Sequence, residues 1–111
     1  MFKLNTDGTA VVKGIRSDTN QELDLDIIQS KIVMILHEQP EASAKVIARN
    51  LEKLGSIIAE AVIYSTLDKL NAMNIAAKRI EPIDIDSRRL TQIYWRLTDR
   101  MSRLVKEAVR G

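Results

Sequence analysis

The apolar positions of the chain change their period three times, and each change marks a different structural region. Over residues 1–22, apolar and polar residues alternate around an Asp7-Gly8 turn signal, which predicts a short β-hairpin followed by a polar loop at 17–21. From about Asp24 the apolar residues recur every three or four positions, as they do in helices. After residue 76 the alternation returns over two segments, and a last helical pattern follows. The pattern predicts an N-terminal arm, a helical region, a β-hairpin and a terminal helix.

The helical region predicts three helices. Pro40 should end the first helix, Ser43 should cap the start of the second, and Gly55 should terminate the second in a left-handed conformation. The third helix is expected over about 59–74. The predicted buried residues of the three helices are, in order, Leu25, Ile28, Ile32 and Ile35; Ile47, Leu51 and Leu54; and Ile63, Leu67 and Leu70. The second and third helices, joined by a short Gly-containing turn, are typical of a helix-turn-helix.

The strand pattern after the helices predicts a β-hairpin over about 77–97, with a polar turn at 84–89. Thr98 should cap the terminal helix. The apolar face of that helix consists of Met101, Leu104, Val105 and Ala108. Three helices, two strands and a helix form a winged helix, an α+β fold that is mainly α. We therefore divide the chain into an N-terminal arm (1–22) and a winged helix-turn-helix domain (23–111). Because an isolated hairpin is marginal in water, we expect a partner subunit to order the arm.

The distribution of charged residues along the chain is more informative than the net charge. The 111 residues carry 17 basic and 15 acidic side chains, a formal net charge of +2. Residues 1–75 contain 8 basic and 10 acidic side chains, whereas residues 76–111 contain 9 basic and 5 acidic ones. The two parts therefore carry −2 and +4. A basic predicted hairpin favours a phosphate-bearing partner such as DNA.

The residues needed for common enzyme chemistry are missing. The chain has no cysteine, a single histidine (His37) and four dispersed glycines, so we expect neither a metal site nor a cofactor, and no enzymatic activity. The longest apolar run, 32–36, is far shorter than the roughly 18 residues that a membrane span requires. The expected location is the cytoplasm.

A winged helix would bind double-stranded DNA with its third helix in the major groove and its wing on phosphates or in the minor groove. The candidates for reading bases are the polar residues of the third helix Tyr64, Ser65, Thr66 and Lys69. The candidates for backbone or minor-groove contact are the wing cations Lys78, Arg79, Arg88, Arg89 and Arg96. Glu60 and Asp68 on the same helix would repel phosphates, and they leave open an alternative: a winged helix that binds protein without DNA.

Three segments resemble PadR-type transcriptional regulators. AVIYSTLDKLNAMNIA (61–76) is similar to their third helix, and RRLTQIYWRLTDR (88–100) to their wing motif. IVMILHEQPEASAKVIARNLEKLG (32–55) is similar to their first two helices. Two departures stand out: Asn74 replaces a customary glycine, and a polar segment (84–87) replaces a glycine-rich wing tip.

The resemblance implies a dimeric regulator, most often a repressor, on a pseudo-palindromic operator with half-sites about 34 Å apart. Dimerisation would use the terminal helix (Met101, Leu104, Val105 and Ala108), the N-terminal arm with the first helix, or both. A small-molecule effector is also implied, but the sequence does not identify it.

Overall fold

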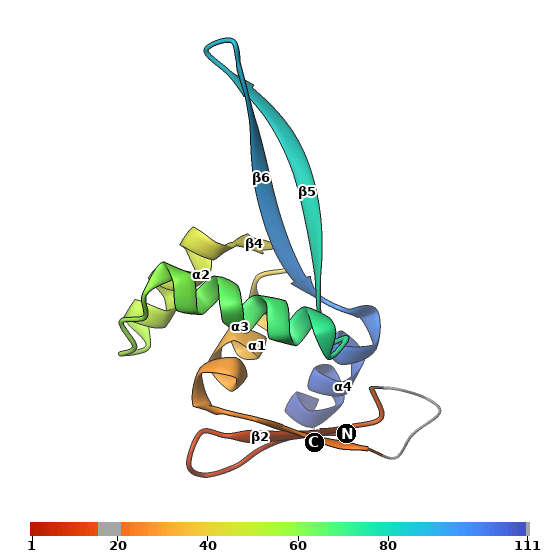
Figure 1. Cartoon of the computed structure of the whole chain (residues 1–111). Coiled ribbons are helices and arrows are strands. Elements are labelled where there is room, and N and C mark those ends of the chain that lie inside the picture. The colour runs from red at the N-terminus through yellow and green to blue at the C-terminus, as the bar shows by residue number, and fades with distance from the viewer. Residues whose placement is uncertain (16–20, 111) are drawn as a thin grey trace.

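The computed structural model describes residues 1–15 and 21–110 and has three parts: a helical core, a long β-ribbon and a small N-terminal sheet (Figure 1). The core helices are α1 (Ile27–Glu38), α2 (Ala44–Lys53) and α3 (Glu60–Ala72), and α4 (Asp99–Arg110) closes the chain. The ribbon projects from one end of the core, and the N-terminal sheet covers the opposite end, where both chain termini lie (Figure 1). This arrangement is a winged helix, as the hydrophobic pattern predicted.

The N-terminal arm is a three-stranded sheet of the domain itself. Strands β1 (Phe2–Leu4), β2 (Ala10–Lys13) and β3 (Glu22–Leu25) pair antiparallel in that order. The predicted hairpin is confirmed; β3 was missed, and the predicted loop at 17–21 lies outside the described residues except for its last position. Phe2 and Val12 are buried in the same core as the helices. The expectation that only a partner subunit would order the arm is therefore wrong.

The helix boundaries follow local capping signals. Asp26 caps α1 by a capping box: its carboxylate accepts from the Gln29 backbone N–H at 2.7 Å, and the Gln29 side chain accepts from the Asp26 N–H at 2.9 Å. We had expected the helix to begin near Asp24, with Leu25 in its buried stripe. Leu25 is buried, but in β3, where it pairs with Ala10. Because Asp26 is the N-cap, α1 begins at Ile27, directly after β3 ends at Leu25.

The helix-turn-helix forms as predicted, except that Leu54 is 54% exposed rather than buried, because α2 ends at Lys53 and Leu54 is its C-cap. Ser43 caps α2 by accepting from the Val46 N–H at 3.3 Å, and Gly55 follows in the left-handed region with φ +88°. Asn74, with φ +61°, ends the α3 segment in the conformation that glycine usually supplies. The three predicted core residues of α3, which are Ile63, Leu67 and Leu70, are fully buried.

The wing spans the predicted residues, but its strands are longer and its turn shorter than the sequence suggested. Strands β5 (Ala76–Ile85) and β6 (Arg88–Leu97) each span ten residues, and a two-residue turn joins them. Both turn residues, Asp86 and Ser87, have positive φ, which matches the twist of a tight hairpin and shortens the turn we had expected at 84–89. A short strand, β4 (Ala42–Ser43), pairs with the base of β6, so the sheet order is β4-β6-β5. β5 is an edge strand, where Pro82 is tolerated.

The terminal helix α4 packs beneath the wing and beside the N-terminal sheet (Figure 1). Thr98 accepts from the Met101 N–H at 3.3 Å, as its predicted cap role requires. Met101 and Val105 are fully buried, Leu104 is half-buried, and Ala108 is exposed rather than inward-facing. Within the described ranges, no helix has the length and apolar character to cross a membrane.

Candidate nucleic-acid interface

The outward face of α3 consists of small and polar side chains. At about 100° per residue, Ser65 lies opposite the buried stripe of the helix, with Ala61, Ala72 and Lys69 nearest to it. These residues are exposed, as are Val62 and Asp68 on the flanks and Tyr64 nearer the buried stripe. Thr66 is half-buried, and its hydroxyl donates to the Val62 carbonyl at 2.7 Å, so its one proton is used within the helix. A narrow helix face of this kind can approach a surface closely.

A hollow lies between α3, the wing and the start of α2. Its volume is about 200 Å³, and Tyr64 and Glu60 from α3 line it. The remaining lining residues are Ser43, Ala44, Lys45, Thr91, Gln92 and Ile93. The N-terminal turn of α2 presents backbone N–H groups and the positive end of the helix dipole, which together favour a phosphate. Lys45 and Gln92 are candidates that the sequence reasoning missed; the Ser43 cap signal just before Lys45 could have identified the first.

The two arginines at the wing tip point to opposite faces of the ribbon, because successive residues of a strand alternate. Arg89 pairs across the ribbon with Asp84, on the face that carries Lys78 and Trp95 nearer the core. Arg88 pairs with Ile85 on the other face. In the part of the chain that the structure describes, neither arginine forms an ion pair. Their guanidinium groups are therefore available, but a single flat surface cannot contact both.

Arg79, in contrast, is fully engaged within the chain. Its guanidinium donates to both Glu41 carboxylate oxygens, at 2.6 and 3.1 Å, and to the Glu81 carboxylate at 3.1 Å. It also lies over the Tyr94 ring, 4.8 Å from the centroid. These bonds lower the pKa of the Glu41 carboxyl and raise the pKa of Arg79. The geometry ties β5 to the segment before β4 and gives Arg79 a role in fixing the wing rather than in contacting a partner.

Arg96 lies at the base of the wing, away from α3. It shares a hollow of about 390 Å³ with Leu36, His37, Pro40, Leu97, Asp99, Ser102 and Lys106, none of which belongs to α3. Its guanidinium donates to the Asp99 carboxylate at 3.4 Å. The structure therefore separates the five predicted wing cations. Arg88 and Arg89 lie at the free end of the ribbon, whereas Lys78, Arg79 and Arg96 lie at its base, where Arg79 and Arg96 each bind a carboxylate.

The Arg79–Glu41 pair predicts a pH dependence of stability. A carboxylate whose folded-state pKa is lowered stabilises the fold above its unfolded-state pKa, and this contribution disappears as the pH falls through the folded-state pKa. We expect Glu41→Gln to lower the melting temperature slightly at pH 7, since an exposed ion pair stabilises a fold only weakly. The difference from wild type should shrink below pH 4.5, the ordinary pKa of this carboxyl. Thermal denaturation by circular dichroism at pH 7 and pH 3 measures this.

The exposed Glu52 on α2 provides a matched control, because Glu52→Gln removes the same charge without touching Arg79. A melting temperature of Glu41→Gln that equals wild type at both pH values would contradict a fixing role for this ion pair.

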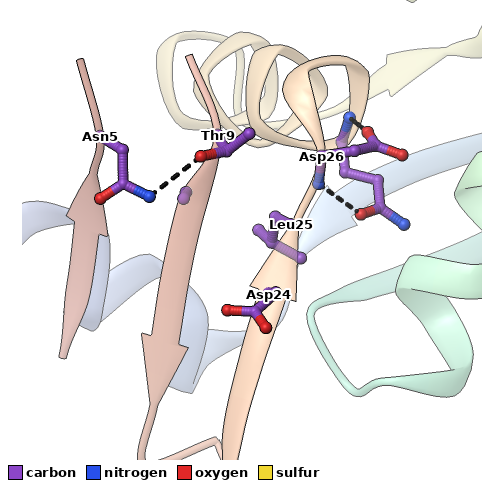
Figure 2. A pocket seen from close by; sticks show the side chains of 7 residues that line it. Asn5, Thr9, Asp24, Leu25 and Asp26 are labelled. Atoms are coloured by element: carbon purple, nitrogen blue, oxygen red, sulfur yellow. Dashed lines mark hydrogen bonds between the residues drawn. The ribbon is translucent and has the colours of Figure 1, made fainter. Parts of the chain in front are cut away.

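Another hollow lies between the N-terminal sheet and the start of α1 (Figure 2). Its polar groups are mostly occupied by local structure: Asn5 donates to Thr9 at 3.0 Å, and Asp26 and Gln29 form the capping box. Asp24 and Asp26 both lie at its rim (Figure 2). Across residues 1–15 and 21–110, no three His, Cys, Asp or Glu side chains come together as a metal site. The hydrogen bonds of the hollow therefore stabilise local structure, and we do not assign it to the candidate interface.

Comparison with known proteins gives matches at the level of structure. No family model matches the sequence, and no curated protein matches it. A PadR-like transcription factor from Bacteroides fragilis superposes with a TM-score of 0.60 at 20% identity, over 76% of this chain and 78% of the other. A PadR family transcriptional regulator from Eggerthella lenta DSM 2243 gives 0.52 at 21% identity, over 76% and 73%.

Bacillus subtilis PadR, solved in complex with operator DNA, superposes with a TM-score of 0.61 at 20% identity. The match covers 78% of this chain but only 48% of PadR, so this chain corresponds to about half of that protein. The fold is therefore the winged helix of PadR-type transcriptional regulators, and the fold implied by the three sequence segments is confirmed.

Proposed function

We propose that this protein is a transcriptional regulator, a repressor, that binds double-stranded DNA sequence-specifically as a homodimer. The observation that supports this most is the outward face of α3, where Ser65 lies between the small side chains of Ala61 and Ala72, with Lys69 on one side and Asp68, then Tyr64, on the other. An α-helix with such a face fits the major groove, where serine and lysine can donate to base edges. The cytoplasm is the expected location of such a regulator.

In this proposal the contacts fall into two sets. Ser65, Tyr64 and Lys69 read bases, and Thr66 contributes as an acceptor only. Lys45 with the start of α2, and Lys78, Arg88 and Arg89 on the wing, contact phosphates or the minor groove. Compared with the sequence-based hypothesis, Lys45 is added. Arg79 is assigned to the support of the wing because it binds Glu41, and Arg96 is left out because it lies away from α3.

Selection of bound duplexes from a random library tests the proposal. We expect an enriched pseudo-palindrome whose half-sites are centred about 10 base pairs apart or a multiple of that, since two copies would place their α3 helices in successive major grooves. Purified full-length protein and a salt concentration near 0.1 M are suitable. A library that shows no enrichment after repeated rounds, despite folded protein, would contradict sequence-specific binding.

We propose that dimerisation uses the end of the molecule opposite the wing. Of the predicted interface residues, Met101 and Val105 are buried within the chain, whereas Ala108 and the N-terminal arm remain accessible. At this end, a groove lined by Phe2, Lys3, Leu4, Ala108 and Val109 separates β1 from the end of α4. Leu4 is 48% and Val109 61% exposed, so two large apolar side chains face solvent at this groove. An interface there leaves α3 and the wing free.

Val109→Glu is expected to convert the dimer to a monomer, because a carboxylate buried in an apolar interface has no partner for its charge. Light scattering coupled to size-exclusion chromatography measures the mass directly. Ile57→Glu is the matched control: Ile57 is 87% exposed in the loop between α2 and α3, far from this groove. A dimer that persists in Val109→Glu, or is lost equally in Ile57→Glu, would contradict this interface.

The alternative, a winged helix that binds protein rather than DNA, is supported by one observation. Glu60 and Asp68 are both exposed on α3 and carry no ion pair among the residues that the structure describes. Two carboxylates on this face would disfavour a phosphate backbone and favour a basic protein surface. The salt dependence of duplex binding distinguishes the two functions.

A further inference from the structure

The wing carries exposed apolar side chains that no other part of residues 1–15 and 21–110 covers. Ile85 is 50% exposed, Leu90 48% and Ile80 57%. A solvated ribbon that needs only to be soluble would carry charged or polar residues at these positions. Several large apolar side chains on one projecting element indicate a contact surface.

The strand register divides these residues between two faces of different chemistry. On one face, Ile83 lies opposite Leu90 and Ile85 lies opposite Arg88. The nearest carboxylate on this face is Glu81, which is bound to Arg79. On the other face, Asp84 lies opposite Arg89 in the strand register, and Asp86 lies in the turn beyond the two faces. The first face therefore combines three apolar side chains with one unpaired guanidinium.

The ribbon is long enough to reach from one groove of a duplex to the next. It is held at its base, where β4 pairs with Tyr94 and Trp95 and where Glu41 binds Arg79. Ile93 still packs against the core, and the five residues beyond it, back to Arg88, extend for about 17 Å at roughly 3.3 Å per residue. If α3 occupies a major groove, the adjacent minor groove is about 17 Å away, half of a 34 Å turn.

We propose, on the basis of the DNA-binding function above, that the wing tip is a minor-groove wedge that bends the operator. Ile85 and Leu90 press against the base pairs, and Arg88 and Arg89 contact the phosphates on either side. Apolar side chains used in this way partly unstack a base step and kink the duplex by about 20–90°. The charge of this face favours DNA as the occupant, because Arg88 borders the apolar side chains directly and the one carboxylate that β5 and β6 place on the face, Glu81, is bound to Arg79. The wedge also predicts flexible TA or CA steps at the flanks of each half-site.

The test uses the duplex obtained by library selection, labelled in two ways. Donor and acceptor dyes at its ends report bending by energy transfer, and 2-aminopurine at successive flanking positions reports unstacking by increased fluorescence. We expect wild-type protein to shorten the end-to-end distance and to raise 2-aminopurine emission at one flanking step. The double variant Ile85→Ser/Leu90→Ser should bind within about tenfold of wild type, with both signals lost.

Ile80→Ser is the matched control, since Ile80 is equally exposed but lies on the face that carries Trp95; it should keep both signals. Emission from Trp95, the only tryptophan, verifies that each variant is folded. Binding without bending or unstacking by wild type would overturn the wedge and leave the DNA-binding function intact. A change of oligomeric mass in the double variant, with bending unaltered, would assign the apolar face to a protein contact. Failure to bind any duplex would remove both proposals.

Discussion

Ser65→Glu is expected to weaken binding to the selected duplex by about 100-fold or more, the largest effect of any surface substitution in this protein. The new carboxylate would be centred on the outward face of α3, where it meets the negative potential of the major groove and replaces a donor at the base edges. Loss of a good base contact alone costs about 1–3 kcal/mol, and an unpaired buried charge adds to that. Fluorescence anisotropy with wild type and variant at one salt concentration measures the ratio.

The fold should not change, because Ser65 is exposed and its side chain makes no bond within the described ranges. Thr6→Glu, in an exposed turn of the N-terminal sheet, adds the same charge far from α3 and should bind as wild type does. Equal affinity of Ser65→Glu and wild type would exclude α3 from the interface, whatever the wing contacts.

Trp95→Ala is expected to cost about 3–5 kcal/mol of stability, a large share of the 5–15 kcal/mol typical of a domain. Trp95 is 1% exposed and lies where β6 meets β4 and α1, so its removal leaves a cavity between the wing base and the helical core. Urea denaturation followed by far-ultraviolet circular dichroism gives the free energy of unfolding, since the variant has no tryptophan to report it.

Trp95→Phe separates packing from hydrogen bonding. The Trp95 Nε1–H is buried and finds no acceptor in the part of the chain that the structure describes, a situation that costs about 1–3 kcal/mol. Phenylalanine keeps an aromatic ring and removes that donor, so its loss of stability should be clearly smaller than that of Trp95→Ala. A cost below about 1 kcal/mol for Trp95→Ala would contradict the role of this residue as the centre of the wing base.

The elements that the sequence predicted well are those specified by neighbouring residues. Ser43, Gly55 and Asn74 each act on the backbone within one helical turn, and the stripe of α3 is a simple period. Strand β3 was missed because its alternation spans only four residues and because Leu25 also fits the helical period of α1. Pairing with β2, far away in sequence, decides its structure.

In the candidate site, too, local sequence predicts some features, whereas others depend on residues far apart in the chain. The position of Ser65 on the outward face of α3 follows from helical geometry alone. The engagement of Arg79 depends on Glu41, 38 residues earlier in the chain, and no local pattern indicates it. The opposite orientation of Arg88 and Arg89 depends on the wing turn being only two residues long, which Asp86 and Ser87 achieve without glycine. Long-range contacts and strand register thus separated the free cations from the bound ones.

The salt dependence of affinity for a random duplex tests the central claim, that this protein binds DNA, most directly. Each phosphate contact contributes about −0.9 to the slope of log affinity against log salt, so wild-type protein should show a slope of roughly −4 or steeper between 50 and 200 mM. Arg88→Ala/Arg89→Ala should weaken binding to all sequences and reduce the magnitude of the slope by about two for each bound subunit. An affinity that is weak and nearly independent of salt would contradict phosphate contact and support the protein-binding alternative.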